Sequence, residues 1–516
     1  MNNLIRNELT KIFHKKALYI VFVITIAVII LNAVLTKIFE NEMDDYMYND
    51  NYISYLEEDI KNLDKNKTDE KEMYYSELAE LKTIELGKKY ENGSWQRYIV
   101  NQNAQSIIYN MLVTEGKPEY DEAKKEYDKL VERLNSGDWK VFAKEELEDV
   151  NAQIKLLEEE KKNEANSATE NIPQEEDGID DIQDEEELYI NPFAGYSLEE
   201  LKDRKQALEW RLEKNISYGT SNMNSILEKW IYSKQELRQY EEQAKTKPLK
   251  YEEKYQKQQS EEMLKLSEYA IINNIADNIS LNNFSNRYNL ASTADSEIID
   301  STSSYLLFIT IAIVIIAGTM ISEEFNKGTI KLLLVRPHKR LKILFAKFIA
   351  CFIVLAISYI VILLSTCIIN GFAYGFNDYT NSVMIYNFNT NAVESIGTFK
   401  YMLLVGVSIL PEFILLMTLA FTLSVLFVNS PIAIALPLLG LMGSDIINQF
   451  ALYYEKAKFL RFFVTPNWDL RMFLFGKLPE FEPISLPFSI TICLIYFVIM
   501  VVVSMVVFNK KEIKNI

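Results

Sequence analysis

The stretch EEFNKGTIKLLLVRPHKRLKILFAK, residues 323–347, lies between two strongly apolar runs. After two acidic residues it carries seven basic ones, namely Lys327, Lys331, Arg336, Lys339, Arg340, Lys342 and Lys347. Short loops rich in lysine and arginine are retained on the cytoplasmic side of a membrane. The stretch therefore predicts a membrane protein and a cytoplasmic location for this loop.

Six apolar runs approach or exceed the length of about 20 residues that a helix needs to cross a bilayer. They are Ala17–Ile38, Ser304–Ile321, Leu344–Ile369, Tyr401–Val428, Pro431–Ile447 and Pro487–Phe508. We therefore expect an all-α membrane protein with six transmembrane helices. A water-soluble protein of this size would have to bury all six in one core. The fifth run is short and carries Asp445.

The charge distribution predicts which parts face which side. Residues 41–300 hold 59 acidic and 33 basic residues, which leaves 13 acidic and 21 basic residues elsewhere. With six spans, the basic N-terminal tail, the 323–347 loop and the basic C-terminal tail share one side, which the charge rule makes cytoplasmic. The acidic insert 41–300 is then extracellular. The first span, within 17–40, lacks a small-residue cleavage site, so we interpret it as a retained anchor.

The insert has the composition and periodicity of a helical, partly coiled-coil domain. The segments 75–90, 144–162 and 197–216 place apolar residues three and four positions apart. Glu200 and Arg204 have the spacing of an ion pair along one helix. We expect the four tryptophans Trp95, Trp139, Trp210 and Trp230 to be core residues more than a binding face.

An acidic linker, 163–190, divides the insert. Nine acids occupy the thirteen residues from Glu175 to Glu187. A calcium site is one interpretation, but Gly178 does not have the spacing of an EF-hand loop. We favour a solvated linker of mutually repelling charges.

The N-terminal residues 1–16 predict an amphipathic helix lying at the cytoplasmic surface. Leu4, Ile5, Leu9, Ile12 and Phe13 form its apolar face, and Arg6, Glu8, Lys11 and Lys15 lie on its other faces. Simple positive flanking of a signal anchor is the alternative.

The 323–347 loop has more structure than a topology signal requires. Thr329, after Gly328, can cap a short helix over 330–335. Pro337 disfavours helical conformation at Arg336 and should end that helix. A second helix, from Lys339 to Phe348, then leads into the third span. This arrangement exposes Leu332, Leu333 and Leu334, which need a partner or lipid to cover them.

These features resemble the ABC-2 type permeases. The resemblance is carried by Glu323 and Glu324, Gly328-Thr329, the leucines 332–334, Pro337, Arg340 and Lys347, by Glu8 and Lys11 near the N-terminus, and by the six-span plan. It covers 1–40 and 301–516, and 41–300 is an insertion between the first two spans. Bacterial members of that family with a large outer domain are often export or antimicrobial-peptide resistance proteins.

The resemblance implies a permease subunit that pairs with a separate ABC ATP-binding subunit, a second permease copy or relative, and membrane lipid. The loop would be the coupling helix, with Leu332, Leu333 and Leu334 as its apolar contact. Arg336, Arg340 and Lys347 would be polar contacts or interface anchors, and Glu323 or Glu324 would pair with a loop base. The chain has no G-x-x-x-x-G-K-[ST] motif, so ATP and magnesium would be bound by the partner. We expect no catalytic residue, no metal site, no cofactor in this chain and no nucleic-acid partner.

Two acids fall in or near the apolar runs. Glu412 follows Pro411 in the fourth run, and Asp445 lies near the outer end of the fifth. An intramembrane acid normally faces a cavity or a partner, so both are candidates for a translocation path or gate. Hydration near the outer surface is the alternative for both.

Between the last two runs, residues 459–481 are rich in phenylalanine. The resemblance suggests short helices that re-enter the outer leaflet, and Trp468 also suits an interfacial belt. We therefore predict the membrane subunit of an exporter for a peptide, antibiotic or lipid-like substrate in the plasma membrane. The alternative function is a membrane-anchored sensor or scaffold whose outer domain binds a peptide or envelope partner.

Overall fold

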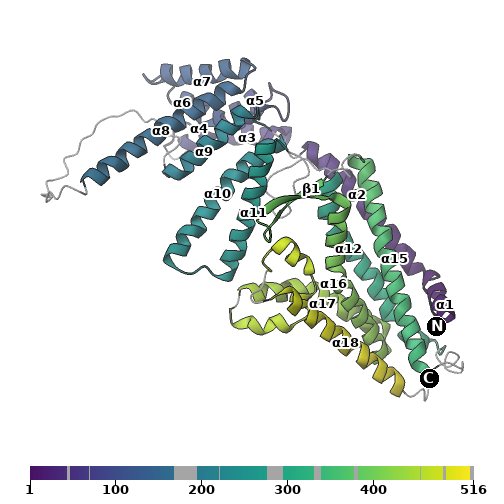
Figure 1. Cartoon of the computed structure of the whole chain (residues 1–516). Coiled ribbons are helices and arrows are strands. Elements are labelled where there is room, and N and C mark those ends of the chain that lie inside the picture. The colour runs from purple at the N-terminus through teal and green to yellow at the C-terminus, as the bar shows by residue number, and fades with distance from the viewer. Residues whose placement is uncertain are drawn as a thin grey trace.

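The computed structural model of the chain describes residues 1–42, 47–68, 70–167, 195–219, 221–275, 294–329, 339–376, 382–453, 455–479 and 484–511. Helices of the described residues form two regions (Figure 1). One is a bundle of long apolar helices, and the other is a group of charged helices beyond one end of it. The N-terminus and the C-terminal end of α18 (Leu486–Lys510) lie at the opposite end of the bundle from these charged helices (Figure 1).

The bundle follows the predicted spans closely. It contains α2 (Lys16–Glu42), α12 (Ala294–Thr319), α15 (Arg340–Tyr374), α16 (Thr398–Phe427), α17 (Ser430–Tyr453) and α18 (Leu486–Lys510). Five of these regions are long and apolar enough to cross a membrane, with α13 (Ser322–Asn326) completing the second of them. The fifth predicted span lies in α17, whose apolar part, Ser430–Ser444, is shorter. The prediction of an all-α membrane protein is thus confirmed in its main feature.

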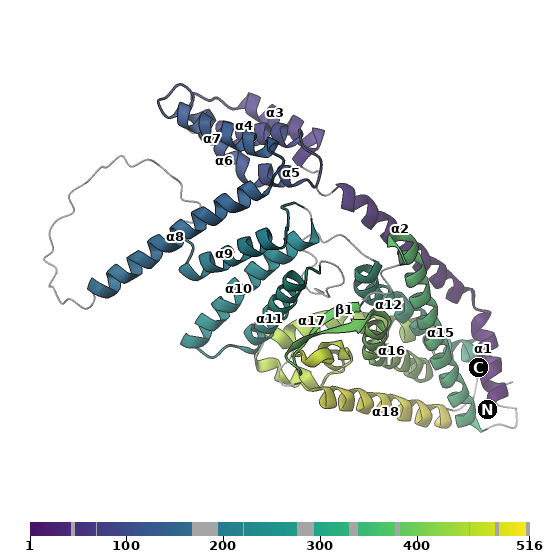
Figure 2. The same ribbon diagram turned by 45° about the horizontal axis from the view of Figure 1, so that its top comes forward.

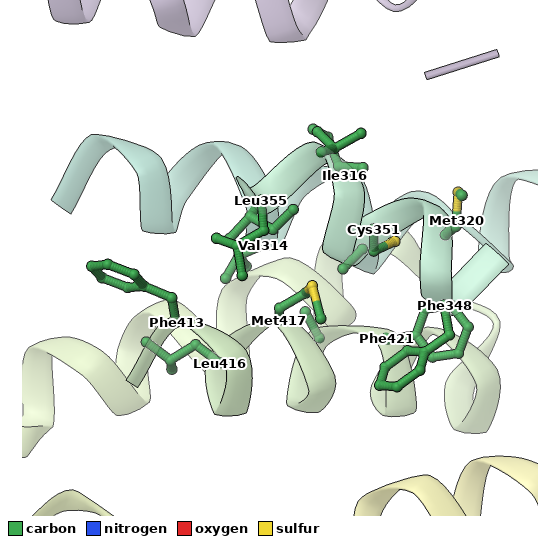
Figure 3. Packing of buried hydrophobic residues seen from close by; sticks show 14 of the residues in the cluster. Val314, Ile316, Met320, Phe348, Cys351, Leu355, Phe413, Leu416, Met417 and Phe421 are labelled. Carbon is green, nitrogen blue, oxygen red and sulfur yellow. The ribbon is translucent and has the colours of Figure 1, made fainter. Parts of the chain in front are cut away.

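The centre of the bundle is α12. Buried residues make up 78% of the α12 region but only 17% of α18. Figure 3 shows the packing around it. The labelled side chains are Val314 and Ile316 of α12, Met320 directly after it, Phe348, Cys351 and Leu355 of α15, and Phe413, Leu416, Met417 and Phe421 of α16. The rings of Phe348 and Phe421 are 5.1 Å apart. Apolar side chains on α2, α15 and α18 point outward instead, as lipid-facing residues do.

The charged helices are those of the predicted insert. They are α3 (Asp50–Asn62), α4 (Lys71–Gly87), α5 (Trp95–Ile99), a π-helical turn at Val100–Ala104, α6 (Gln105–Val113), α7 (Tyr120–Asn135), α8 (Lys140–Ser167), α9 (Leu198–Glu213), α10 (Asn222–Thr246) and α11 (Tyr251–Asn273). The expected helical segments 75–90, 144–162 and 197–216 correspond to α4, α8 and α9. Helices α8 and α9 pack together, as do α10 and α11. The acidic stretch 175–187 lies outside the described residues.

The expected core tryptophans are confirmed, but the expected pair of Glu200 and Arg204 is wrong. Trp139 and Trp230 are buried, and Trp95 and Trp210 pack against two buried clusters of these charged helices. Glu200 accepts a hydrogen bond from the Ser197 amide (2.8 Å) and completes a capping box at the start of α9. Arg204 instead forms a salt bridge with Glu146 of α8 (2.6 Å). Glu200 therefore caps its own helix, and Arg204 pairs with an acid on the neighbouring helix, so the two side chains do not pair with each other.

The two regions are joined by a two-stranded hairpin, and this hairpin was not predicted from the sequence. Strands β1 (Ser382–Asn387) and β2 (Ala392–Gly397) are antiparallel, with Ser382 opposite Gly397. In Figures 1 and 2, β1 lies between α11 and the bundle. Contacts of α11 with both strands, and of α16 with both strands, agree with that position.

Between α17 and α18 the chain forms short helices, as the resemblance suggested. They are η4 (Glu455–Phe462), η5 (Thr465–Asn467) and η6 (Leu470–Gly476). The interpretation of Trp468 as an interfacial belt residue is wrong, because its side chain is buried in the bundle core. The neighbouring Asn467 holds the segment in place, since its carboxamide oxygen accepts a hydrogen bond from Ser489 of α18 (2.9 Å).

Candidate functional site

The N-terminal helix α1 (Asn2–Phe13) supplies the first residue of the candidate site. The sequence placed Glu8 on a polar face, but the structure buries it. Positions 4, 8 and 12 lie above one another on a helix, and Ile12 is fully buried in the bundle core. Glu8 is therefore an acid inside the apolar stripe of α1, and it is 6% exposed.

The second residue follows a break in the second span. Helix α12 ends at Thr319 and α13 begins at Ser322. The Ser424 hydroxyl of α16 accepts hydrogen bonds from the amides of Ile321 (3.3 Å) and Ser322 (3.0 Å). Because these buried amides have a partner, the break does not leave them unsatisfied. It directs α13, which carries Glu323 and Glu324, toward α1.

Lys347 on α15 joins these elements. Its side chain is fully buried, and its ammonium lies 2.6 Å from a Glu8 oxygen and 2.8 Å from a Glu324 oxygen. Lys11 of α1 contacts the same two carboxylates, at 2.9 Å and 2.8 Å. We call Glu8, Lys11, Glu324 and Lys347 the inner charge cluster. It contains two positive and two negative groups, so the charges compensate one another where burial would make an unpaired charge costly.

The pKa values of the α1 residues follow from this geometry. Burial by itself would raise the pKa of Glu8, but the charge of Lys347 and hydrogen bonds from Lys347 and Lys11 outweigh it, so that pKa is lowered. Burial would lower the pKa of Lys11, but hydrogen bonds to Glu324 and Glu8 raise it. Both residues are thus held in their charged forms.

A second layer of polar contacts surrounds the cluster. Lys15 lies 3.1 Å from Glu323 and donates a hydrogen bond to Thr319 (2.7 Å). Arg340, at the start of α15, donates to the carbonyls of Asn509 (3.2 Å) and Lys511 (3.1 Å) at the end of α18. Lys511 in turn donates to the carbonyls of Val425 and Leu426 of α16. Cations at these helix C-termini satisfy carbonyls that have no partner within the helix.

The predicted coupling residues divide into three groups. Glu323 and Glu324 pair with bases as expected, Glu323 with Lys15 and Lys327, Glu324 with Lys11 and Lys347. Lys347 and Arg340 were expected as polar contacts for a partner or anchors at the interface. Lys347 is instead fully buried within this chain, and Arg340 binds the end of α18. Leu332, Leu333, Leu334, Arg336 and Pro337 lie outside the described residues.

Gly328 and Thr329 are the last described residues in the first part of the 323–347 loop. Gly328 has a φ of +68°, a conformation that glycine adopts without strain. The Thr329 hydroxyl donates backward to the Glu324 carbonyl (3.3 Å). The helix that Thr329 was expected to cap, 330–335, is not among the described residues.

The predicted intramembrane acids lie on other helices than the inner charge cluster. Glu412 is half-buried on α16. It lies near Arg471 of η6, which forms a salt bridge with Asp469 (2.7 Å). Burial would lower the pKa of Arg471, but Asp469 and, more weakly, Glu412 raise it. Asp445 belongs to α17, and its side chain is not described. No group of three or more His, Cys, Asp or Glu residues gathers as a metal site in the described part of the chain.

Comparisons with known proteins concern mainly the bundle. A family model described as "Protein of unknown function (DUF2705)" matches residues 265–514, which begin within α11 and include all of α12 to α18. "Uncharacterized protein YhcI" of Bacillus subtilis (strain 168) is 26% identical over 244 residues, which cover 46% of this chain and 76% of that protein. "Uncharacterized membrane protein YdbK" of the same organism is 27% identical over 201 residues, covering 39% and 76%. No solved structure matches significantly. The chain is thus similar to a membrane protein, in agreement with its apolar helices.

The sequence pointed to all four residues of the inner charge cluster, but it did not predict that they contact one another. Glu8 and Lys11 were noted at the N-terminus, and Glu324 and Lys347 at the two ends of the loop. The burial of Glu8 could have been inferred from its position, since it stands four residues from both Leu4 and Ile12 in the apolar stripe. An acid at such a position requires a buried partner.

Proposed function

We propose that this chain is the membrane subunit of an ATP-driven ABC-2 type exporter. The chain would work with a separate ATP-binding subunit and a second permease copy. One observation supports the proposal most: the inner charge cluster connects the two helices that flank the 323–347 loop, and it connects both to α1. A push on the loop would therefore move α1, α13 and α15 together.

In this mechanism the loop is the contact for the ATPase, and the partner binds ATP and magnesium. The loop, α1 and both chain ends would be cytoplasmic, with six spans and the 41–300 region outside. The basic loop and the position of α1 and the C-terminal end of α18 at one end of the bundle support that orientation (Figure 2). The substrate would be a peptide, an antibiotic or a lipid-like molecule.

The cluster gives the proposed movement a physical basis. Removing one partner of a buried ion pair is costly because the other charge stays buried. Movements that would separate Lys347 from Glu8 or Glu324 are therefore disfavoured, and movements that keep the three helices together are favoured. ATP-driven displacement of the loop would then be passed to α12 and α15 as a rigid-body shift.

Copurification of the tagged chain from its native membrane tests the proposal. We expect an ABC ATP-binding protein in the complex and ATP hydrolysis by it. Leu333→Asp and Arg336→Glu should each lower ATP hydrolysis or assembly of the complex. The first places a charge in the expected apolar contact, and the second reverses the charge of an expected polar contact. Arg340 is a poor choice for this test, since its side chain holds α18.

Leu156→Asp is the matched control, because Leu156 is an exposed leucine on α8 of the outer region. It should leave hydrolysis unchanged. If Leu333→Asp and Arg336→Glu complexes assemble and hydrolyse ATP normally, the coupling assignment is wrong. Recovery of a kinase or an envelope protein, with no ATPase, would favour the alternative of a membrane-anchored sensor or scaffold.

A further inference from the structure

Helix α11 of the outer region contacts the segment that follows η6 at three successive residues. Glu262 forms a salt bridge with Lys477 (2.8 Å). The Gln258 side chain accepts a hydrogen bond from the Leu478 amide (2.6 Å), and the Tyr251 hydroxyl donates to the Pro479 carbonyl (2.5 Å). We call this set the outer clamp.

The α11 residues of the clamp form one stripe. Positions 251, 258 and 262 are separated by seven and four residues, which places them on one face of a helix. The stripe meets residues 477–479 in antiparallel order, so the contact is continuous along both segments. Glu262 is enclosed enough that burial raises its pKa despite the opposing effect of Lys477.

The β1–β2 hairpin makes a second connection beside the clamp. Side chains on a strand alternate between two faces. Tyr386, with Met384 and Phe388, packs into the core of α10 and α11. Val383 and Ile385 point to the opposite face, where they pack with Ile396, Tyr401 of α16 and Phe475 of η6.

The end of the hairpin is bonded directly to η6. The Phe388 amide donates a hydrogen bond to the Phe475 carbonyl (2.8 Å). Residues 475–479 are therefore held from two sides, by the hairpin and by α11. The outer start of α16 is held by the same hairpin through Tyr401.

We infer that α11 is the element through which the outer region controls the outer end of the bundle, by way of the clamp and the hairpin. A partner or ligand that shifts α10 and α11 would move residues 475–479 and the first turn of α16 with them. The inference goes beyond the proposed function and holds for a transporter and for a sensor alike.

Hydrogen exchange of the purified full chain in lipid nanodiscs tests it without any ATPase. In Glu262→Lys, we expect amides of residues 474–479, of β1 and of the first turn of α16 to exchange about tenfold faster, since local opening becomes easier. Lys477→Glu should do the same. The double variant Glu262→Lys/Lys477→Glu should return the rates toward those of the native chain, because the charges are paired again.

Two matched controls lie on the same helix. Lys265→Glu disturbs an exposed pair with Glu268 and should leave these amides unchanged. Gln258→Leu should speed exchange of the Leu478 amide, whereas Gln256→Leu should not, because Gln256 contacts Tyr240 of α10 instead.

Two outcomes would overturn the inference. One is faster exchange at 477–479 with unchanged rates in β1 and α16, which would make the clamp a local contact only. The other is a double variant no better than either single variant. Neither outcome depends on whether the chain exports a substrate.

Discussion

Lys347 of α15 and Glu8 of α1 are 339 positions apart in the chain, yet their charged groups lie 2.6 Å apart in the protein interior. Glu324 contacts the same ammonium, so three helices meet at one lysine. Helix α1 is itself expected at the cytoplasmic surface, and α13 and α15 lie at the two ends of the expected cytoplasmic loop. The contact therefore makes the stability of this end of the bundle depend on the same residues as its proposed movement.

Replacing Lys347 should destabilise the protein strongly. In Lys347→Met, the buried carboxylate of Glu8 and the partly buried carboxylate of Glu324 would be left with Lys11 as their only cation in the cluster. We expect the free energy of unfolding to fall by about 3–5 kcal/mol, the usual cost of breaking a buried ion pair. Thermal unfolding of the detergent-purified protein measures this. Lys342→Met, at an exposed lysine of the same helix, should change the melting temperature little, and equal losses in the two variants would contradict the role of the cluster.

The contribution of Glu8 should depend on pH in a defined direction. The pKa of Glu8 is lowered in the folded protein, from an ordinary value of about 4.5. Its stabilisation is therefore complete above that ordinary value and is lost as the pH falls through the lower folded value. The difference in melting temperature between the native protein and Glu8→Gln should stay constant near neutral pH and shrink in acid.

Lys11 should show the opposite dependence. Its pKa is raised in the folded protein, so its contribution to stability is complete below the ordinary pKa of lysine and is lost as the pH rises through the raised pKa.

Glu57→Gln, at an exposed carboxylate of α3, serves as the control for the Glu8 variant. If the Glu8→Gln difference persists unchanged into acid, the ion pairing of Glu8 is not its source of stabilisation.

Arg340 should hold the end of α18. Removing its two hydrogen bonds in Arg340→Ala leaves the Asn509 and Lys511 carbonyls without that donor. We expect amides in the last turn of α18 to exchange about tenfold faster, because hydrogen bonds from charged donors are among the stronger ones. Lys339→Ala, which changes the exposed residue directly before it, should have no such effect. An unchanged α18 in Arg340→Ala would return Arg340 to the group of candidate partner contacts.

Two glycines should respond in opposite ways to alanine. A Cβ at Gly318 of α12 would lie 2.9 Å from Ile434 and 3.2 Å from the Ala433 backbone of α17. Gly318→Ala should therefore cost about 1–3 kcal/mol, as overpacking does. A Cβ at Gly440 meets nothing within 4 Å, so Gly440→Ala should be neutral or stabilise α17 by up to about 1 kcal/mol. Thermal unfolding distinguishes the two, and a stable Gly318→Ala variant would show that α12 and α17 separate easily.

Local pattern was sufficient wherever a segment has one dominant property. The apolar runs predicted the long helices of the bundle, and α15 begins at Arg340, one residue from its expected start. The three- and four-residue spacing of leucines predicted α4, α8 and α9. These features depend on residues close in the chain, because helix formation uses hydrogen bonds between neighbouring turns.

Partner choice was not predictable in the same way. Arg204 had a nearby acid at the right spacing but pairs with Glu146, which is 58 positions away. Trp468 is of a residue type common at membrane interfaces, but its side chain is buried, because η5 and η6 pack against α16 and α18. Strand β1 was missed because both of its faces are apolar, so no alternation marks it.

The sequence by itself determined the membrane class of this protein, the approximate positions of its long helices and the separation of a charged helical insert from an apolar bundle. Each of these results rests on composition or on periods of a few residues. Only the tertiary structure decided that Glu8 is buried, that Lys347 faces two carboxylates, and that α11 reaches residues 477–479. Such contacts arise where distant segments bury charges or hydrogen-bonding groups together, and a buried charge must find its partner wherever the fold brings one.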